Sequence, residues 1–233
     1  MLTLAIDTTT AVCSVALARD GQVLAEITTN LPRTHSQRLM PLVDALCQET
    51  GLAPVDLELL AVTRGPGSFT GLRIGIATVK GLGLALGLPV VAASSLQVLA
   101  HNFGGRALVC PVLNARREQV YTALFRTGSD PAPQVIMPEQ AISTAQLLEV
   151  LGEYDEPIWF CGDAVSLILP SIQKALPQAK EAPLHLGGPR AAAMADLARY
   201  LPTIPVDELT PLYLRESQAE VQLRLRQEVD HGC

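Results

Sequence analysis

The chain has 233 residues, 48% of them hydrophobic, which is enough for one large domain or two modest ones with a filled core and excludes a disordered chain. Asp and Glu outnumber Lys and Arg by 23 to 17, for a net charge of −6. Proteins that hold nucleic acid unaided usually have a basic face, so we expect any RNA contact to depend on a partner protein.

The cysteines do not have the spacing of a zinc site or a disulfide frame. They are Cys13, Cys47, Cys110, Cys161 and Cys233, and the first four fall in apolar patterns. We therefore expect buried free thiols in a reducing compartment. A strand pattern starts at the first residues without a signal peptide, so we predict a cytoplasmic protein.

The N-terminal segment predicts strands over residues 2–6, 12–18 and 23–28. The first two are joined by a run that begins Asp7-Thr8-Thr9. An acid and hydroxyls at such a tip resemble the phosphate-binding turn of actin-like, sugar-kinase and Hsp70-like folds. Asp7, Thr8 and Thr9 are thus candidate nucleotide contacts. The alternative is that their side chains satisfy the amides of the turn itself.

A helix is predicted to start near Gln37 or Arg38, because Pro41 is tolerated only close to a helix start, and to end at Gly51. Its apolar face carries Leu39, Leu42, Val43 and Leu46. His35 precedes this helix without a second histidine at metal-binding spacing. We interpret it as a cap or hydrogen-bond partner.

The most distinctive stretch is a strand over 59–63, the loop Gly65-Pro66-Gly67, and a helix over 70–86 capped by Ser68 or Thr70. This helix is apolar on nearly all sides, so one face should pack on the core and the other on a second surface. The run is too short to span a membrane and contains Arg73 and Lys80, so we expect no membrane span here. Gly71 and Gly75 lie one turn apart and would let a partner helix approach closely. An anion site at the helix start remains an alternative, although the Lys-Ser/Thr pair of a Walker loop is missing.

The remaining pattern predicts a second lobe after Gly104-Gly105, giving domains at 1–104 and 105–233. We expect strands over 89–93, 107–113, 119–125 and 158–161, and an irregular segment over 127–138. Helices are expected from Ser94-Ser95 to Asn102, from Ser143 to Leu151, before Pro177, over 191–201 and over 216–229. Residues 211–215 should be extended.

Several strings together closely resemble the bacterial TsaB family, also called YeaZ. They are Leu4-Ala5-Ile6-Asp7-Thr8, His35-Ser36, the run from Gly65 to Gly75, Ala115-Arg116-Arg117 followed by Val120-Tyr121, and Pro211-Leu212-Tyr213-Leu214-Arg215. The resemblance implies an α/β fold of the two-lobed actin-like ATPase (ASKHA) type, with mixed sheets flanked by helices. It also implies a role in forming N6-threonylcarbamoyladenosine (t6A) beside the anticodon of tRNA.

In that family the chain is a non-catalytic subunit, an inactive paralogue of its partner TsaD, which carries the metal and transfers the threonylcarbamoyl group. The ATPase TsaE joins the pair, and the subunit forms homodimers when alone. The resemblance thus implies no catalytic residue and no metal here, no required cofactor, weak ATP or ADP binding at most, and contact with tRNA only through the complex. Asn114 stands where the family usually has an acid, and only Gly162-Asp163-Ala164 or Gly187-Gly188 could form an adenosine clamp, which fits a silenced enzyme.

The partner interface is predicted on the two helices over 37–50 and 70–87. Its residues would be Leu39, Val43, Gly71, Arg73, Gly75, Val79 and Leu82. The alternative function is an active ATPase or small-molecule kinase of the same fold, which Asp7, Thr8 and Thr9 would serve. A protease has no support, because neither Ser36 nor Ser68 can be assigned a histidine and an acid by spacing.

Overall fold

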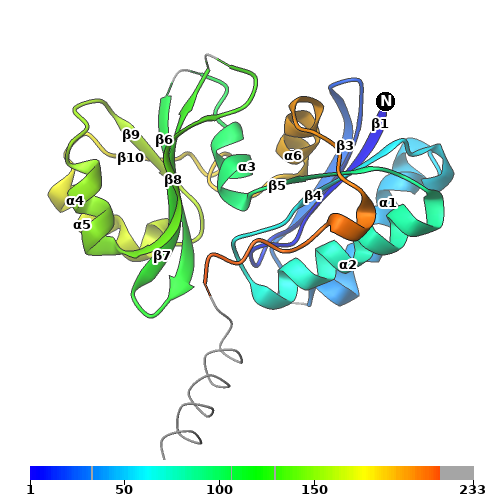
Figure 1. The fold of residues 1–233 in the computed structure, drawn as a ribbon, viewed down its shortest axis with the longest axis horizontal. Helices are drawn as coiled ribbons and strands as arrows, with labels where there is room; N and C mark the ends of the chain where they lie inside the picture. The colour runs from blue at the N-terminus through cyan, green and yellow to red at the C-terminus, as the bar shows by residue number, and fades with distance from the viewer. Residues whose placement is uncertain (33, 106, 129, 216–233) are drawn as a thin grey trace, which may run out of the picture.

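Two five-stranded sheets lie side by side in the computed structural model, which describes residues 1–32, 34–105, 107–128 and 130–215 (Figure 1). The first sheet has the strand order β3-β2-β1-β4-β5. Its strands are β1 (Leu2–Asp7), β2 (Cys13–Arg19), β3 (Gln22–Thr29), β4 (Leu59–Thr63) and β5 (Val90–Ala93). The first three form antiparallel hairpins, and β4 and β5 run parallel to β1. The architecture is the expected α/β fold with mixed sheets.

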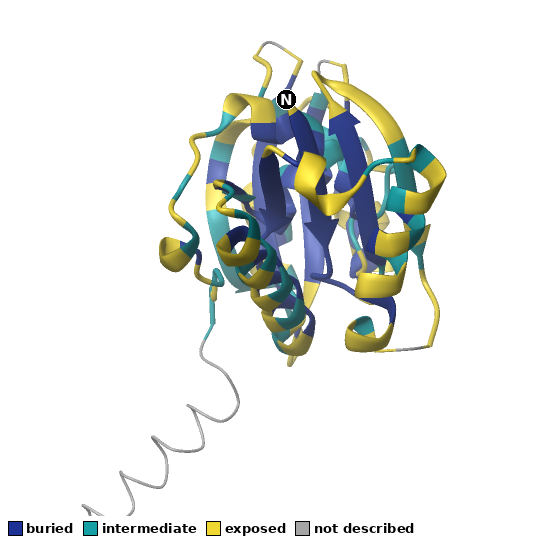
Figure 2. Ribbon diagram, turned by 90° about the vertical axis from the view of Figure 1, so that its right-hand side faces the viewer, coloured by how far each residue is buried: buried dark blue, intermediate teal, exposed yellow. Residues whose placement is uncertain are grey.

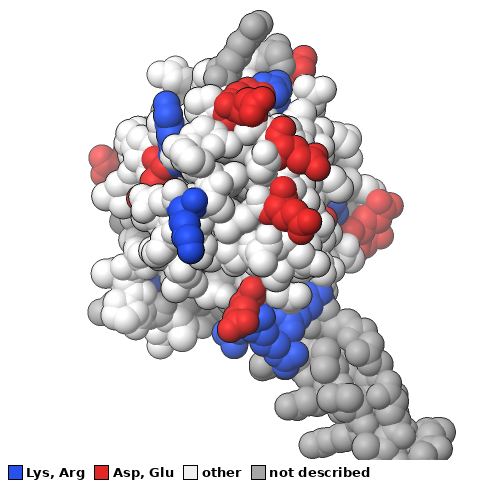
Figure 3. All heavy atoms as spheres, turned by 90° about the vertical axis from the view of Figure 1, so that its left-hand side faces the viewer, with Lys and Arg blue, Asp and Glu red and all other residues white. Residues whose placement is uncertain are grey.

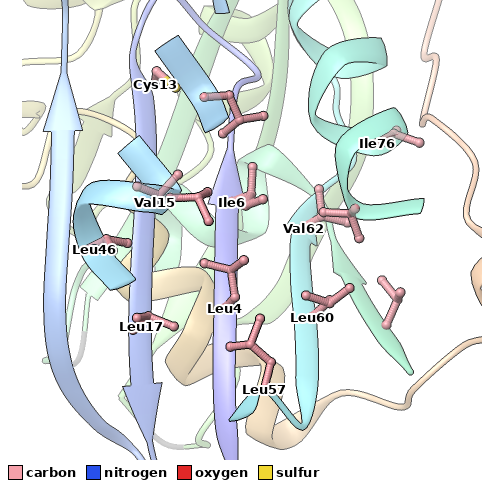
Figure 4. Close-up of a cluster of buried hydrophobic side chains, with 14 of the residues drawn as sticks. Leu4, Ile6, Cys13, Val15, Leu17, Leu46, Leu57, Leu60, Val62 and Ile76 are labelled. Carbon is pink, nitrogen blue, oxygen red and sulfur yellow. The ribbon is translucent and has the colours of Figure 1, made fainter. Parts of the chain in front are cut away.

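The two faces of the first sheet carry side chains of different size. Leu4, Ile6 and Leu60 point to one face, where helices α1 (His35–Thr50) and α2 (Phe69–Leu86) cover them (Figure 4). The alternate residues Ala5 and Ala61 point to the other face, against helix α6 (Ala191–Leu197). Successive side chains of a strand alternate between faces, so the small residues let α6 approach the sheet closely. Figure 2 shows these central strands buried behind helices whose outward sides are exposed.

Helix α1 starts at His35, earlier than the predicted start at Gln37 or Arg38. Pro41 therefore lies in its second turn, on the exposed side. The missing amide of Pro41 leaves the carbonyl four residues earlier without its helical partner, and at an exposed position water can satisfy that carbonyl. Gly51 ends the helix in the left-handed conformation, as expected.

Ser68, one of the two caps that the sequence allowed, caps helix α2 and accepts a hydrogen bond from the amide of Gly71. By length and composition α2 is able to cross a membrane, with a mean hydropathy of 1.3 over 18 residues, so the expectation that the run is too short is wrong. The core helix of a folded domain passes the same test, and 33% of α2 is buried within the fold.

The second sheet has the strand order β10-β9-β6-β7-β8. Its strands are β6 (Ala107–Arg116), β7 (Gln119–Thr127), β8 (Gln134–Ser143), β9 (Ile158–Cys161) and β10 (Lys180–Glu181). Helices α4 (Thr144–Leu151) and α5 (Val165–Ala175) share one core with this sheet, and α3 (Ser95–His101) packs on β6 and β7 from the other side. Two short helical turns, η1 (Pro54–Asp56) and η3 (Val206–Glu208), lie in the first lobe, and η2 (Ala198–Tyr200) extends α6.

The segment predicted to be irregular over 127–138 is irregular at residues 128 and 130–133, but residues 134–138 form the first half of β8, so the expectation is wrong there. Pro138 lies within β8, which is an edge strand with register shifts against β7. A proline at an edge removes no hydrogen bond from a second neighbouring strand. Proline content therefore misled the sequence analysis at this position.

The predicted lobe boundary at Gly104-Gly105 separates the two sheets, but the assignment of all later residues to a second lobe is wrong. Helix α6 packs on β1, β2 and β3 of the first sheet, and Ile204 pairs with Val90 at its edge. The chain therefore returns to the first lobe after finishing the second sheet. The helix predicted over 216–229 lies outside the described residues.

Candidate functional site

The first turn, residues 8–12, joins β1 to β2 and is fixed by its own side chains. One carboxylate oxygen of Asp7, Oδ1, accepts hydrogen bonds from the amide of Thr9 at 2.9 Å and its hydroxyl at 2.8 Å. The hydroxyl of Thr8 donates to the carbonyl of Gly71 at 2.8 Å. All three residues predicted to contact a nucleotide are buried, and of these only Thr9 lines the neighbouring cleft. The side chains of Asp7 and Thr8 thus make hydrogen bonds to groups of the turn and of α2. This arrangement agrees with the alternative interpretation, in which these side chains stabilise the turn and do not contact a nucleotide.

The other carboxylate oxygen of Asp7, Oδ2, is buried without a hydrogen-bond partner in the described part of the chain. Burial raises the pKa of Asp7, and the hydrogen bonds from Thr9 together with the nearby hydroxyl of Thr63 only partly oppose this effect. Burying a carboxylate with an unpaired oxygen costs free energy whenever the group is charged. Asp7 therefore makes the fold less stable at a pH above its raised pKa.

Asp7→Asn is expected to increase the free energy of unfolding at about pH 8 by about 1 kcal/mol or more, because it removes the buried charge. The new amide can donate to the unpaired hydroxyl of Thr63, in the strand beside Asp7. A group with a raised pKa stabilises the fold only when protonated, so the difference between parent and variant should shrink as the pH falls through the raised pKa of Asp7. Urea unfolding of both proteins across pH measures this difference, and one that grows toward acid would contradict the prediction.

His35 and Arg38, at the start of α1, support the first turn from outside. His35 Nε2 is 2.8 Å from the carbonyl oxygen of Thr10, and burial lowers the pKa of His35. Arg38 is buried and donates to the carbonyl of Ala11 at 3.2 Å and to the hydroxyl of Thr29 at 3.0 Å. The interpretation of His35 as a hydrogen-bond partner is confirmed.

The second turn comprises the last three residues of β6 and the two residues that join it to β7, residues 114–118, and it faces the first turn across a cleft. Asn114 Oδ1 accepts from the amide of Arg116 at 2.7 Å. Asp163, between β9 and α5, accepts from the amide of Asn114 at 2.9 Å, and burial raises the pKa of its carboxyl. The amide of Asn114 is thus held by a carboxylate that reaches the turn from another segment.

Sequence reasoning missed this role of Asp163, although the pair Gly162-Asp163 after a buried strand was a signal. Gly162 has a φ of 107°, and a Cβ there would lie 2.2 Å from the carbonyl oxygen of Val112. Only glycine allows the loop to pass that close to β6. This close approach is what brings Asp163 beside the second turn.

The cleft between the two turns has a volume of about 670 Å³. Its lining includes Thr9, Ser68, Asn114 and Asp163, together with four arginines described below. A second hollow of about 960 Å³ adjoins it and includes Gly187 and Gly188. The glycines that resembled an adenosine clamp therefore lie in the hollow rather than the cleft. In the residues that the structure describes, no group of three or more His, Cys, Asp or Glu could hold a metal ion.

The Pro-Leu-Tyr-Leu-Arg segment ties the two lobes together at the cleft. The amide of Leu212 donates to the carbonyl of Arg64 at 2.8 Å, after β4 in the first lobe. Tyr213 stacks on Phe69 of α2, with ring centroids 4.5 Å apart. Arg215 donates to the carbonyl of Ala115 in the second turn at 2.9 Å. This motif thus fixes the second turn relative to the start of α2.

Gly71 and Gly75 do allow a close backbone approach, but not by a partner helix. A Cβ at Gly71 would lie 2.1 Å from the carbonyl oxygen of Thr8, and one at Gly75 would lie 2.4 Å from the hydroxyl of Thr8. The prediction that these two glycines lie at the partner interface is therefore wrong. Both face the first turn of their own chain.

Three more residues predicted at the interface are also core residues. Leu39, Val43 and Val79 are buried in the cluster between the first sheet and its two helices, so they cannot form the outer surface. Leu82 is partly buried and Arg73 is exposed, and their place at an interface remains a prediction. On a helix that is apolar all round, periodicity cannot tell which face points inward.

The two-lobed arrangement is that of an actin-like ATPase fold. Solved structures of low identity share this fold alone, such as the ethanolamine utilization protein EutJ from Carboxydothermus hydrogenoformans. That structure has a TM-score of 0.53 at 12% identity and matches 84% of this chain and 89% of its own.

A family model described as TsaD, tRNA N6-adenosine threonylcarbamoyltransferase, matches residues 22–223. The tRNA threonylcarbamoyladenosine biosynthesis protein TsaB of Bacillus subtilis is 39% identical over 95% of this chain and 97% of its own length. The solved structure of YeaZ from Pseudomonas aeruginosa is 30% identical with a TM-score of 0.76, matching 91% of this chain and 99% of that one. The chain belongs to the TsaB (YeaZ) family.

Proposed function

We propose that this chain is the non-catalytic scaffold and activating subunit of the complex that transfers a threonylcarbamoyl group to the adenosine beside the anticodon of tRNA. The observation that carries the proposal is the 39% identity to TsaB of Bacillus subtilis, a protein named for threonylcarbamoyladenosine biosynthesis, because it extends over 95% of the chain and both lobes. The chain then works in the cytoplasm, where it contacts tRNA as part of the complex; alone it binds tRNA only weakly.

A non-catalytic role is supported by how the first turn uses its polar groups. Asp7, Thr8 and Thr9 are all buried and hydrogen-bonded within the fold, and of the three only Thr9 lines the cleft. A catalytic carboxylate has to reach the reacting atoms or their water. The chain therefore requires no cofactor, and ATP or ADP binds weakly at most.

The partner is a TsaD-type protein, and the outer sides of α1 and α2 are the surface that it covers. On α2, Arg73, Ala77, Gly81 and Leu84 are exposed and lie on one side of the helix, with Leu84 74% exposed. Met40 on α1 is 47% exposed. Exposed apolar side chains grouped in this way favour a protein interface. A second copy of the chain covers the same surface when the partner is absent, and TsaE joins the pair.

The test is to mix the purified chain with the TsaD-type protein of the same organism and measure the mass in solution. A complex containing both chains is expected, and t6A should form on tRNA only when this chain is present with TsaE. Separate elution of the two proteins, or full t6A formation without this chain, would refute the proposal.

The alternative, an active ATPase or small-molecule kinase, is favoured by one observation: Asp163 places a carboxylate beside the second turn, facing the first across the cleft. Phosphate release from ATP by the isolated protein separates the two functions. We expect release at the rate of buffer alone. Turnover that Asp163→Asn abolishes would favour the enzyme.

A further inference from the structure

Arginines gather at the cleft although the chain as a whole is acidic. Arg73 of α2, Arg116 and Arg117 of the second turn, and Arg215 line the cleft, against the single acid Asp163. In the whole sequence acids exceed bases by 23 to 17. Figure 3 shows Lys and Arg side chains gathered at the lower end of one face, next to an acidic side chain, and scattered elsewhere on that face. The cleft is thus a local cationic site.

Arg116 and Arg117 lie side by side in the second turn. Both are exposed, and no ion pair involves either of them within the described part of the chain. Their φ angles are 62° and 51°, in the left-handed region where glycine is usually preferred. The turn thus carries two cationic side chains where glycine would be the less strained choice, and it projects both into solvent beside the cleft.

The opposite wall of the cleft is held rigid by aromatic contacts. Arg73 lies over the ring of Phe69, 5.7 Å from its centroid, and its Nε donates to the hydroxyl of Tyr213 at 3.1 Å. Arg215 is anchored to the carbonyl of Ala115 at 2.9 Å. Cations held in place lose less side-chain entropy when they meet an anion.

We propose that Arg116, Arg117 and Arg215 bind phosphate groups of a single-stranded segment of RNA at the rim of this cleft. The inference deepens the proposed function, since it names the surface with which this chain would touch the tRNA. The exposed carboxylate of Asp163 at the second turn repels an anion seated deep in the cleft, and the arginines come from two separate segments at its mouth, the second turn and residues 211–215. A polymer that crosses the rim can meet all of them, whereas a mononucleotide phosphate would have to sit near Asp163.

The test measures binding of an unmodified tRNA transcript by the full chain alone. The variant is Arg116→Gly with Arg117→Gly, because glycine keeps the left-handed turn while removing both charges. The matched control is Arg19→Ala with Lys174→Ala, which removes two charges from exposed positions outside the cleft. Fluorescence anisotropy at several salt concentrations gives Kd and its salt dependence, and ATP is titrated in parallel.

At about 50 mM salt, the turn variant should weaken tRNA binding about tenfold, and the slope of log Kd against log salt should fall by about 1.4, or about 0.7 for each lost phosphate contact. The control should bind like the parent. A turn variant with the affinity and slope of the parent would overturn the inference, as would a parent without measurable binding at this salt. Loss of ATP binding with unchanged tRNA binding would assign the site to a nucleotide instead.

This outcome is independent of the proposed function, because no partner is present in the binding assay. If the chain pairs with the TsaD-type protein and supports t6A formation while the turn variant binds tRNA normally, only the RNA surface is wrong. If the turn variant loses tRNA affinity but the chain does not pair, the scaffold role fails and the RNA surface stands.

Discussion

Gly71→Ala is expected to destabilise the fold by about 3 kcal/mol, because its methyl group would lie 2.1 Å from the carbonyl oxygen of Thr8. A backbone atom in a buried turn cannot move aside as the end of a flexible side chain can. The same substitution at Gly81, on the exposed side of α2 with nothing within 4 Å, should instead stabilise the fold by about 1 kcal/mol through helix propensity.

Urea unfolding at one protein concentration measures both changes against the parent. A Gly71→Ala variant as stable as Gly81→Ala would mean that α2 does not contact the first turn. The same geometry applies to Gly75→Arg. A Cβ at Gly75 would lie 2.4 Å from the hydroxyl of Thr8, so this variant is expected to unfold.

Ala77→Arg should abolish pairing with the TsaD-type partner while leaving the chain folded. Ala77 is exposed on the outer side of α2, between Arg73 and Gly81 in the same row. In the complex the added guanidinium would be buried without a counter-ion, at a cost of about 3 kcal/mol or a more than about 100-fold loss of affinity. In the free chain the arginine is solvated and suits a helix.

The matched control for this variant is Ala175→Arg, at an exposed position of α5 in the second lobe. Circular dichroism should be unchanged for both variants, and sedimentation with the partner should show loss of the complex for Ala77→Arg alone. If Ala77→Arg still pairs at full strength, the outer side of α2 is not the interface.

The sequence predicted the positions of helices and strands better than it predicted which face of each helix is buried. The strands over 59–63 and 158–161 and the cap at Ser68 match the structure because each depends on local residues. The orientation of α2 could not be predicted, since the helix is apolar all round and only its contacts with the first turn show which face is inside.

Long-range pairing accounts for the other errors. Asp163 reaches the second turn because β9 runs parallel to β6, and no local pattern predicts that pairing. The first half of β8 was predicted to be irregular because the prolines of residues 127–138 were weighed without knowing that β8 is an edge strand. The family resemblance identified the fold class, yet it did not show that Asp7 would be buried and partly unpaired.

The return of α6 to the first sheet affects the order in which this protein can fold during synthesis. All five strands of the first sheet have left the ribosome once Ala93 has emerged, but α6, which covers one face of that sheet, begins only at Ala191. Until then the alanine-rich face of β1, β2 and β4 has no helix to bury it. The first lobe therefore remains incomplete while the whole second sheet is synthesised. During that time its exposed apolar face can bind chaperones or associate with other unfolded chains.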